Sequence, residues 1–129
     1  MISDRIARSA ARFALLAAVM TGVPAAAHHG WSWTEDGMFE LRGIITDIYF
    51  GNPHPTLDVD VEGESWRVEL ATPSATTRTG FTEDTAKVGD EVTALGNRSR
   101  EETERRMKAV RITVNGKSYD VYPSRVPPA

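Results

Sequence analysis

Two short stretches of alternating residues, separated by a turn, constrain the fold of this chain most strongly. In residues 57–61 Leu and Val alternate with Asp, and in residues 66–70 Trp, Val and Leu alternate with Arg and Glu. Such alternation is typical of a strand with one face buried. The intervening Glu62-Gly63-Glu64 is a turn sequence, so we expect the two strands to form an antiparallel β-hairpin.

Further strands are predicted on both sides of this hairpin. Residues 39–50 are rich in Ile, Phe and Tyr, and they contain Gly43, which indicates a bulge or a bend within the strand. Another strand is expected over residues 92–96, after a Val-Gly-Asp turn. The mixed charges of residues 98–106 are typical of a solvated loop.

A second hairpin is predicted near the end of the chain. Val and Ile alternate with polar residues over 110–114, and the dipeptide Asn115-Gly116 follows directly. Asn-Gly is a strong hairpin signal because both residues tolerate a positive φ. The return strand is expected over residues 119–122.

One short helix is predicted between the third and fourth strands. Thr72 followed by Pro73 is typical of an N-cap and a first helical turn, and Gly80 suits the end of the helix. This order predicts an all-β fold: a small OB-like β-barrel of about five to six strands with one short helical insertion. A small open β-sandwich is the alternative.

The first 27 residues have the order of a secretory signal peptide. Three arginines precede an apolar run over residues 13–20, and residues 25–27 are alanines that suit signal peptidase. The run is shorter than the roughly 20 residues of a membrane-spanning helix. We therefore expect cleavage after Ala27, an OB-like domain over residues 28–123, a tail over residues 124–129, and a periplasmic location in a Gram-negative host. An uncleaved anchor is the alternative.

The composition of the remaining chain excludes several classes of function. Removing three Arg and one Asp with the leader leaves 12 basic and 17 acidic side chains, a formal charge of −5. An acidic chain is a poor partner for nucleic acid or an anionic membrane. The absence of Cys excludes thiolate catalysis and Cys-based metal sites. The chain contains no GxSxG, P-loop, HExxH or GxGxxG motif, so a function without catalysis is favoured and enzymatic activity is left open.

Cleavage after Ala27 would make His28 the first residue of the mature chain. A terminal His carries an α-amine and an imidazole that chelate one metal ion together. Their pKa values are about 8 and about 6.5, so both groups lose their protons near neutral pH at modest cost. Copper favours such nitrogen ligands in a planar or T-shaped set.

Two other histidines could complete the metal site. His54 lies between Pro53 and Pro55 in a predicted loop, and it would supply a third nitrogen if the terminal segment folds back along the barrel. His29 would be a fourth ligand or would point to solvent. The arrangement resembles the histidine brace of copper-binding proteins of the CopC type and of lytic polysaccharide monooxygenases. Copper is the expected ion, and zinc is the alternative.

A different cleavage site would change the metal chemistry. Cleavage after Ala26 would give Ala27-His28-His29, in which the third-position His suits a square-planar copper or nickel site with backbone nitrogens. This cut puts Pro24 at the −3 position, which disfavours it. Without a metal, the terminal histidines would be solvated polar residues, and His54 would cap a turn.

Several segments together resemble a known family. They are HHGWSW, GNPHPTLDVDV, WRVELATPS, VGDEVTALGNRSR and RRMKAVRITVNGKSYDVYP. The set is similar to a family of small exported bacterial proteins classified only as a domain of unknown function, and it covers the chain from His28 to about Pro123. The resemblance implies a secreted, single-domain, OB-like protein, and it implies no activity.

Three hypotheses follow for the function. The first is a periplasmic copper-binding protein for copper handling or delivery, with a periplasmic or inner-membrane protein as its partner. The second is a metal-free OB-like binding or adaptor module that holds a protein or small ligand through Trp31, Trp33 and Tyr49. The third, a copper oxidase or monooxygenase, has the least support because no acid or base near the metal is identifiable.

Overall fold

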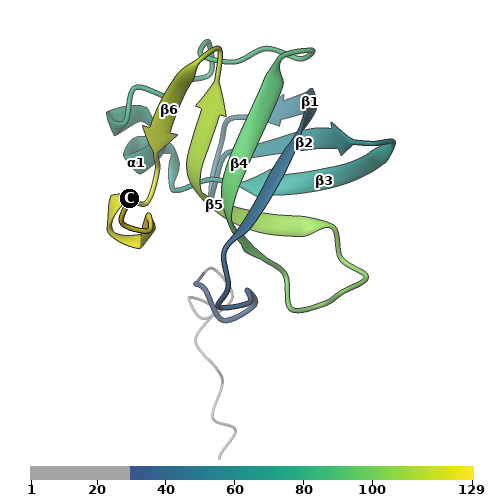
Figure 1. Ribbon diagram of the computed structural model, residues 1–129. Helices are drawn as coiled ribbons and strands as arrows, with labels where there is room; N and C mark the ends of the chain where they lie inside the picture. Colours follow the sequence, from purple (N-terminus) through teal and green to yellow (C-terminus); the bar gives the residue numbers. More distant parts are fainter. Residues whose placement is uncertain (1–29) are drawn as a thin grey trace, which may run out of the picture.

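The computed structural model describes residues 30–129, which form a small all-β domain (Figure 1). In chain order the elements are β1 (Phe39–Tyr49), β2 (Thr56–Val61), β3 (Glu64–Glu69), α1 (Pro73–Arg78), β4 (Glu91–Arg98), β5 (Arg106–Val114), β6 (Lys117–Asp120) and the 3-10 turn η2 (Pro123–Arg125).

The strands close into a barrel. Their order in the sheet is β3-β2-β1-β4-β5-β6, and an additional pairing joins β3 to β5. The β3–β5 pairing is parallel and the other pairings are antiparallel, so five strands form a closed mixed barrel and β6 extends it beside β5. The predicted OB-like barrel is confirmed. Its interior is filled by alternate side chains of these strands, among them Ile45, Leu57, Val59, Val68, Val92, Met107 and Ile112.

Both predicted hairpins form. β2 and β3 pair with Leu57 opposite Val68, and their turn has positive φ at Glu62 and Gly63. The turn between β5 and β6 has φ values of 51° at Asn115 and 75° at Gly116, which are the left-handed conformations that this dipeptide favours.

The predicted helix lies between β3 and β4. The hydroxyl oxygen of Thr72 accepts a hydrogen bond from the backbone N–H of Ala75 at 3.3 Å, and Pro73 occupies the first turn. Gly80 follows the helix with φ of 93°. Six residues form the whole helix, and the chain then returns through a loop to β4.

Gly43 predicted a bulge or a bend within this strand, and β1 does contain an irregularity, although not at Gly43 itself. The register of the β1–β2 pairing shifts between Ile45 and Asp47, whereas Gly43 pairs regularly with Val92 of β4. Gly43 lies next to Ile44, where the pairing of β1 passes from β4 to β2. A Cβ atom there would come within 2.2 Å of the carbonyl oxygen of Asp60, so the glycine permits the close approach of β2.

Replacement of Gly43 by alanine is therefore expected to destabilise the barrel. The added methyl group would meet backbone rather than a flexible side chain, and we expect a loss of about 2 kcal/mol in the free energy of unfolding. Gly37→Ala is the matched control, because an added Cβ there has nothing within 4 Å. Urea unfolding of the two variants measures the difference. Equal stabilities would contradict the steric role of Gly43.

Candidate functional site

His54 is the one predicted metal ligand among the described residues, and it is buried. His54 lies in the loop between β1 and β2, flanked by Pro53 and Pro55, and only 8% of its surface is exposed. The other two predicted ligands, His28 and His29, lie outside the described residues. Two observations therefore bear on a metal site. They are the surroundings of His54 and the course of the chain immediately after His29.

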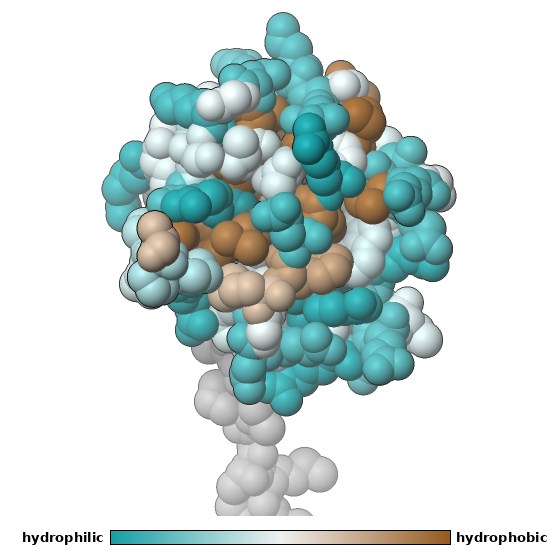
Figure 2. Space-filling view, in the orientation of Figure 1, coloured by the Kyte–Doolittle hydropathy of each residue, from teal (hydrophilic) through white to brown (hydrophobic). Residues whose placement is uncertain are grey.

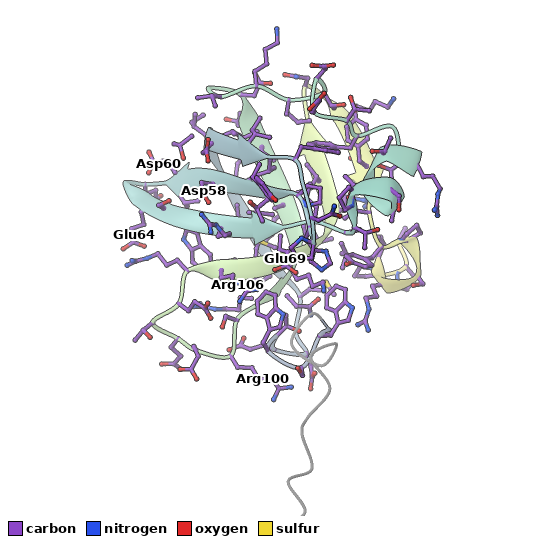
Figure 3. All side chains as sticks on the ribbon, turned by 180° about the vertical axis from the view of Figure 1, so that it is seen from behind. Asp58, Asp60, Glu64, Glu69, Arg100 and Arg106 are labelled. Atoms are coloured by element: carbon purple, nitrogen blue, oxygen red, sulfur yellow. The ribbon has the colours of Figure 1, made fainter. Side chains whose placement is uncertain are left out.

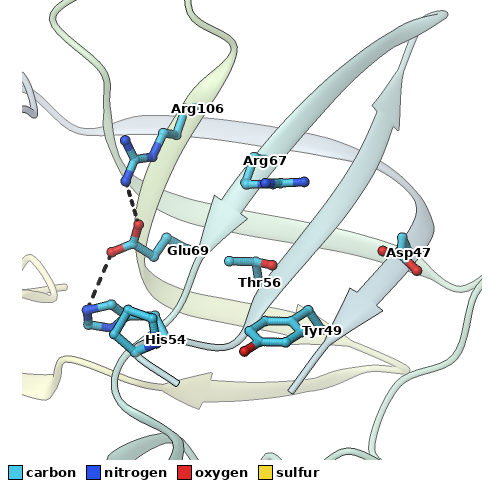
Figure 4. Close-up of a pocket in the computed structure, with 8 residues that line it drawn as sticks. Asp47, Tyr49, His54, Thr56, Arg67, Glu69 and Arg106 are labelled. Atoms are coloured by element: carbon cyan, nitrogen blue, oxygen red, sulfur yellow. Dashed lines mark hydrogen bonds and ion pairs between the residues drawn. The ribbon is translucent and has the colours of Figure 1, made fainter. Parts of the chain in front are cut away.

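Glu69, at the end of β3, stands at the centre of a group of charged side chains (Figure 4). Its Oε1 atom is 3.7 Å from Nε2 of His54 and 3.7 Å from Nζ of Lys108. Its Oε2 atom accepts a hydrogen bond of 2.8 Å from Nη2 of Arg106. We call these four residues the Glu69 cluster.

The closure of the barrel brings the cluster together. In the parallel β3–β5 pairing, Glu69 lies opposite Lys108, and the neighbouring pair Val68 and Met107 points into the core. Glu69 and Lys108 therefore point to the outside of the barrel, because side chains alternate along a strand. They are nevertheless buried, with 7% and 1% of their surfaces exposed. Another segment must cover them.

That segment is the chain just after the predicted histidine pair, residues 30–34, which we call the N-terminal strap. Nζ of Lys108 donates a hydrogen bond of 3.3 Å to the carbonyl oxygen of Gly30 and lies 4.7 Å from the ring centre of Trp31. The guanidinium of Arg106 lies 3.9 Å from the ring centre of Trp33. The strap is thus held on the outer wall of the barrel by the cations of the Glu69 cluster.

Three further contacts fix the strap. The ring of Trp31 packs edge-on against Tyr122, with centres 4.9 Å apart, and the guanidinium of Arg125 lies 3.9 Å from the Trp31 ring centre. At the other end of the strap, Nε of Arg100 donates a hydrogen bond of 2.7 Å to the carbonyl oxygen of Thr34. Trp31 and Trp33 therefore attach the terminal segment to the barrel and are engaged by cations.

Burial changes the protonation equilibria of two groups here. It lowers the pKa of the Lys108 ammonium, and the nearby Glu69 carboxylate opposes this change. Burial, with the charge of Glu69, raises the pKa of Tyr122 to about 12, so its hydroxyl stays protonated at neutral pH.

An open pocket of about 500 Å³ lies on one side of His54 (Figure 4). Its walls come from the ends of β1, β2 and β3, and Tyr49 is half exposed there. The Tyr49 hydroxyl donates a hydrogen bond of 2.8 Å to the carbonyl oxygen of Asn52, which leaves the ring face to the pocket. The lining residues are Asp47, Tyr49, Pro53, His54, Thr56, Arg67, Glu69 and Arg106.

The carboxylates farther along the barrel are more exposed than that of Glu69. Asp58, Asp60 and Glu64 project from the outer side of the β2–β3 hairpin, away from Glu69 (Figure 3). Asp58 pairs with Arg67 at 2.9 Å, and Glu64 pairs with Arg105 at 2.7 Å, both as partly exposed ion pairs. The face of the molecule in Figure 2 is mostly hydrophilic at its margins, as expected for a solvated surface.

Within residues 30–129 no group of three or more His, Asp or Glu side chains is arranged to hold a metal ion. His54 and Glu69 are two donors at most. The other predicted ligands, His28 and His29, precede the described residues.

Glu69, Arg106 and Lys108 were not predicted from the sequence as functional residues. Glu69 was one of the polar residues of an alternating strand, and Arg106 was the end of a predicted loop. One local signal was present, because Lys108 stands in a run of otherwise apolar residues over 107–110. A lysine at such a position indicates a buried partner.

Comparison with known proteins supports the fold and assigns no activity. The chain is similar to a solved structure, the S. pombe Stn1–Ten1 complex, at 17% sequence identity with a TM-score of 0.51; the match covers 62% of this chain and 59% of that one. At this identity the likeness shows the fold alone. No curated protein matches the chain. Among the described residues, no helix is long and apolar enough to span a membrane.

One family model matches residues 16–108, and it describes a family of unknown function, DUF6152. The match includes the barrel from β1 into β5, together with the strap and the His54 loop. The resemblance to a domain-of-unknown-function family is thereby confirmed, and the chain belongs to the family DUF6152.

Proposed function

We propose that this protein is an exported copper-binding protein for copper handling or delivery, in which His28 of the mature chain chelates the ion through its α-amine and imidazole. His54 supplies a further nitrogen from the barrel. Copper binds such nitrogen donors more tightly than the other divalent first-row metals do, and zinc is the competing ion. Signal-peptide cleavage after Ala27, with delivery to the periplasm, is part of the proposal.

The observation that carries the proposal is the anchoring of Gly30. Its carbonyl oxygen is held by Lys108, whose ammonium shares the Glu69 carboxylate with His54. Gly30 is thus linked to His54 through Lys108 and Glu69, and the two residues before Gly30 add at most about 7 Å when extended. This supports a site made jointly by the terminus and His54.

Glu69 has a defined role in such a site. Histidine ligands of metals are usually oriented by a carboxylate or a carbonyl oxygen, and Glu69 is the carboxylate beside His54. Its negative charge would also attract a bound metal ion. This attraction would offset part of the repulsion that Arg106 and Lys108 exert on the ion. The separation of 3.7 Å between Glu69 and His54 is an ion-pair distance, longer than a hydrogen bond.

A metal-free binding module is the second candidate, and the pocket beside His54 favours it. Tyr49 offers an exposed aromatic face to that pocket, as a small-ligand site requires. Trp31 and Trp33, by contrast, are covered by arginines and are poor candidates for contacts with a partner.

Replacement of His54 tests the copper proposal. For His54→Ala in a chain that begins at His28, we expect Cu(II) affinity to fall at least about 10-fold, because a ligand is lost. Tyr49→Phe is the control, since it changes the same pocket and leaves the imidazole. Competition titration with a coloured chelator measures the affinities, and urea unfolding of the copper-free variants measures any loss of stability. An unchanged affinity would remove His54 from the site.

A further inference from the structure

The outward-facing side chains of three strands form the floor of the pocket beside His54. These side chains lie in rows across the strands, because β1 pairs with β2 and β2 pairs with β3. One row is Tyr49, Thr56 and Glu69, and the next row is Asp47, Asp58 and Arg67. Asp47 therefore lies at the opposite end of the pocket from the Glu69 cluster (Figure 4).

Asp47 has no matching cation. It lies directly opposite a second carboxylate, Asp58, and like charges in this position repel each other. Arg67 donates hydrogen bonds of 2.9 and 3.1 Å to the two carboxylate oxygens of Asp58. This contact is the main cause of the raised pKa of Arg67, and the charge of Asp47 is a smaller cause. Among the described residues, Asp47 forms no ion pair of its own.

The two ends of the pocket differ in their balance of charge. In the Glu69 cluster two cations meet one carboxylate, and Glu104, at 3.6 Å from Arg106, supplies a second negative charge. That end is formally neutral when His54 is counted as neutral. At the Asp47 end, two carboxylates and one guanidinium leave a formal charge of −1. A positively charged group is therefore favoured at the Asp47 end.

Tyr49 presents a fixed aromatic face beside Asp47. The two residues are two positions apart on β1, and both line the pocket. The Tyr49 hydroxyl donates a hydrogen bond to the carbonyl oxygen of Asn52, and a Cβ atom on Gly51 would come within 2.5 Å of that hydroxyl oxygen. These contacts hold a ring that is half exposed. The face of an aromatic ring attracts cations, and it does so without removing them from a neighbouring carboxylate.

We propose that this pocket binds a small organic ammonium ion, whose charged group lies against the ring of Tyr49 and beside the carboxylate of Asp47. The volume of about 500 Å³ suits a ligand of this size. Ca²⁺ and Mg²⁺ take about six or more oxygen ligands, and within residues 30–129 no group of three acidic or histidine side chains is arranged to hold a metal ion. The inference is independent of copper binding, and it gives the second candidate function a class of ligand.

The experiment is a titration with choline, followed by the amide NMR signals of the metal-free chain that begins at His28. Saturable shifts are expected at the pocket strands, around Asp47, Tyr49 and Thr56. One ring and one exposed carboxylate contribute roughly 1 kcal/mol each, so we expect a Kd in the millimolar range. The comparison ligand is dimethylbutanol, the uncharged alcohol in which carbon replaces the choline nitrogen. It should bind at least about 3-fold more weakly.

Four variants assign the binding to the two groups. Tyr49→Leu and Asp47→Asn should each weaken choline binding at least about 3-fold. Tyr49→Phe keeps the ring and should bind as the wild type does. Glu40→Gln is the charge control, because Glu40 is an exposed carboxylate of β1 that lies opposite Leu95 of β4 and outside this pocket. The spectrum of each free variant shows whether it is folded.

Three results would overturn the inference. They are the absence of saturable shifts, equal binding of choline and the uncharged alcohol, and equal weakening by Asp47→Asn and Glu40→Gln, which would indicate only the overall charge of the chain. Calcium chloride that displaces choline and shifts the same amides would identify a metal-ion site instead. Copper binding is titrated separately, so either proposal can fail while the other stands.

Discussion

A chain that begins at His28 is expected to bind one copper ion tightly, and a four-residue Gly-Ser-Gly-Ser extension ahead of His28 should weaken that binding at least about 100-fold. The extension converts the α-amine of His28 into an amide nitrogen, which is a poor ligand at neutral pH. The two-point chelate at the terminus is thereby lost. Competition titration on the two proteins measures the change.

The same extension placed after Ala129 is the control. It adds equal length and composition, and it leaves the amine of His28 free, so copper affinity should stay at the wild-type value. Neither extension should change the melting temperature of the copper-free protein, because both leave the strap and the barrel unaltered. Tight copper binding by the chain with the N-terminal extension would contradict the proposed role of the terminal amine.

Replacement of Glu69 by alanine is expected to cost about 3 kcal/mol in the free energy of unfolding of the copper-free protein. The variant leaves Lys108 buried without its carboxylate, and it removes the partner of Arg106 at 2.8 Å. The strap, which these cations hold, should become more susceptible to proteolysis. Urea unfolding and limited proteolysis measure the two effects.

Glu64→Ala is the matched control for this prediction. Glu64 also lies on β3 and pairs with an arginine, Arg105, but that pair is about half exposed. Exposed ion pairs contribute little, and we expect a change within about 0.5 kcal/mol. If the two variants lose the same small amount of stability, the Glu69 cluster does not hold the strap as described.

The local parts of this fold could be predicted from the sequence because they depend on neighbouring residues. Alternation over residues 57–61 and 66–70 specified which face of each strand is buried, and Asn115-Gly116 supplied the backbone conformation of a tight turn. The cap at Thr72 was predictable for the same reason. The position of the bulge in β1 was not, because it depends on how two neighbouring strands pair with one bent strand.

The Glu69 cluster could not be predicted, because it depends on contacts between distant residues. The pairing of β3 with β5 brings Glu69 opposite Lys108 across the closure of the barrel, and no local pattern specifies such a parallel pairing. The prediction of a loop over residues 98–106 is a second reason why Arg106 was not identified. Their charges predicted a loop, yet β4 continues to Arg98 and β5 begins at Arg106. Arg106 is therefore part of a strand that faces Glu69.

The burial of His54 could likewise not be predicted from the sequence. Flanking prolines predicted a loop, which is correct, and most loop residues are exposed. His54 is nevertheless buried, and the Glu69 side chain at the end of β3 lies beside it. The prediction that His54 joins His28 at a metal ion remains a prediction.

The most direct test of the central claim is the intact mass of the exported protein, measured under native conditions on material purified without added metal chelators. We expect a mature chain that begins at His28 and carries one copper ion. A chain that begins at another residue, or one that begins at His28 and takes up copper only weakly when it is added, would contradict it.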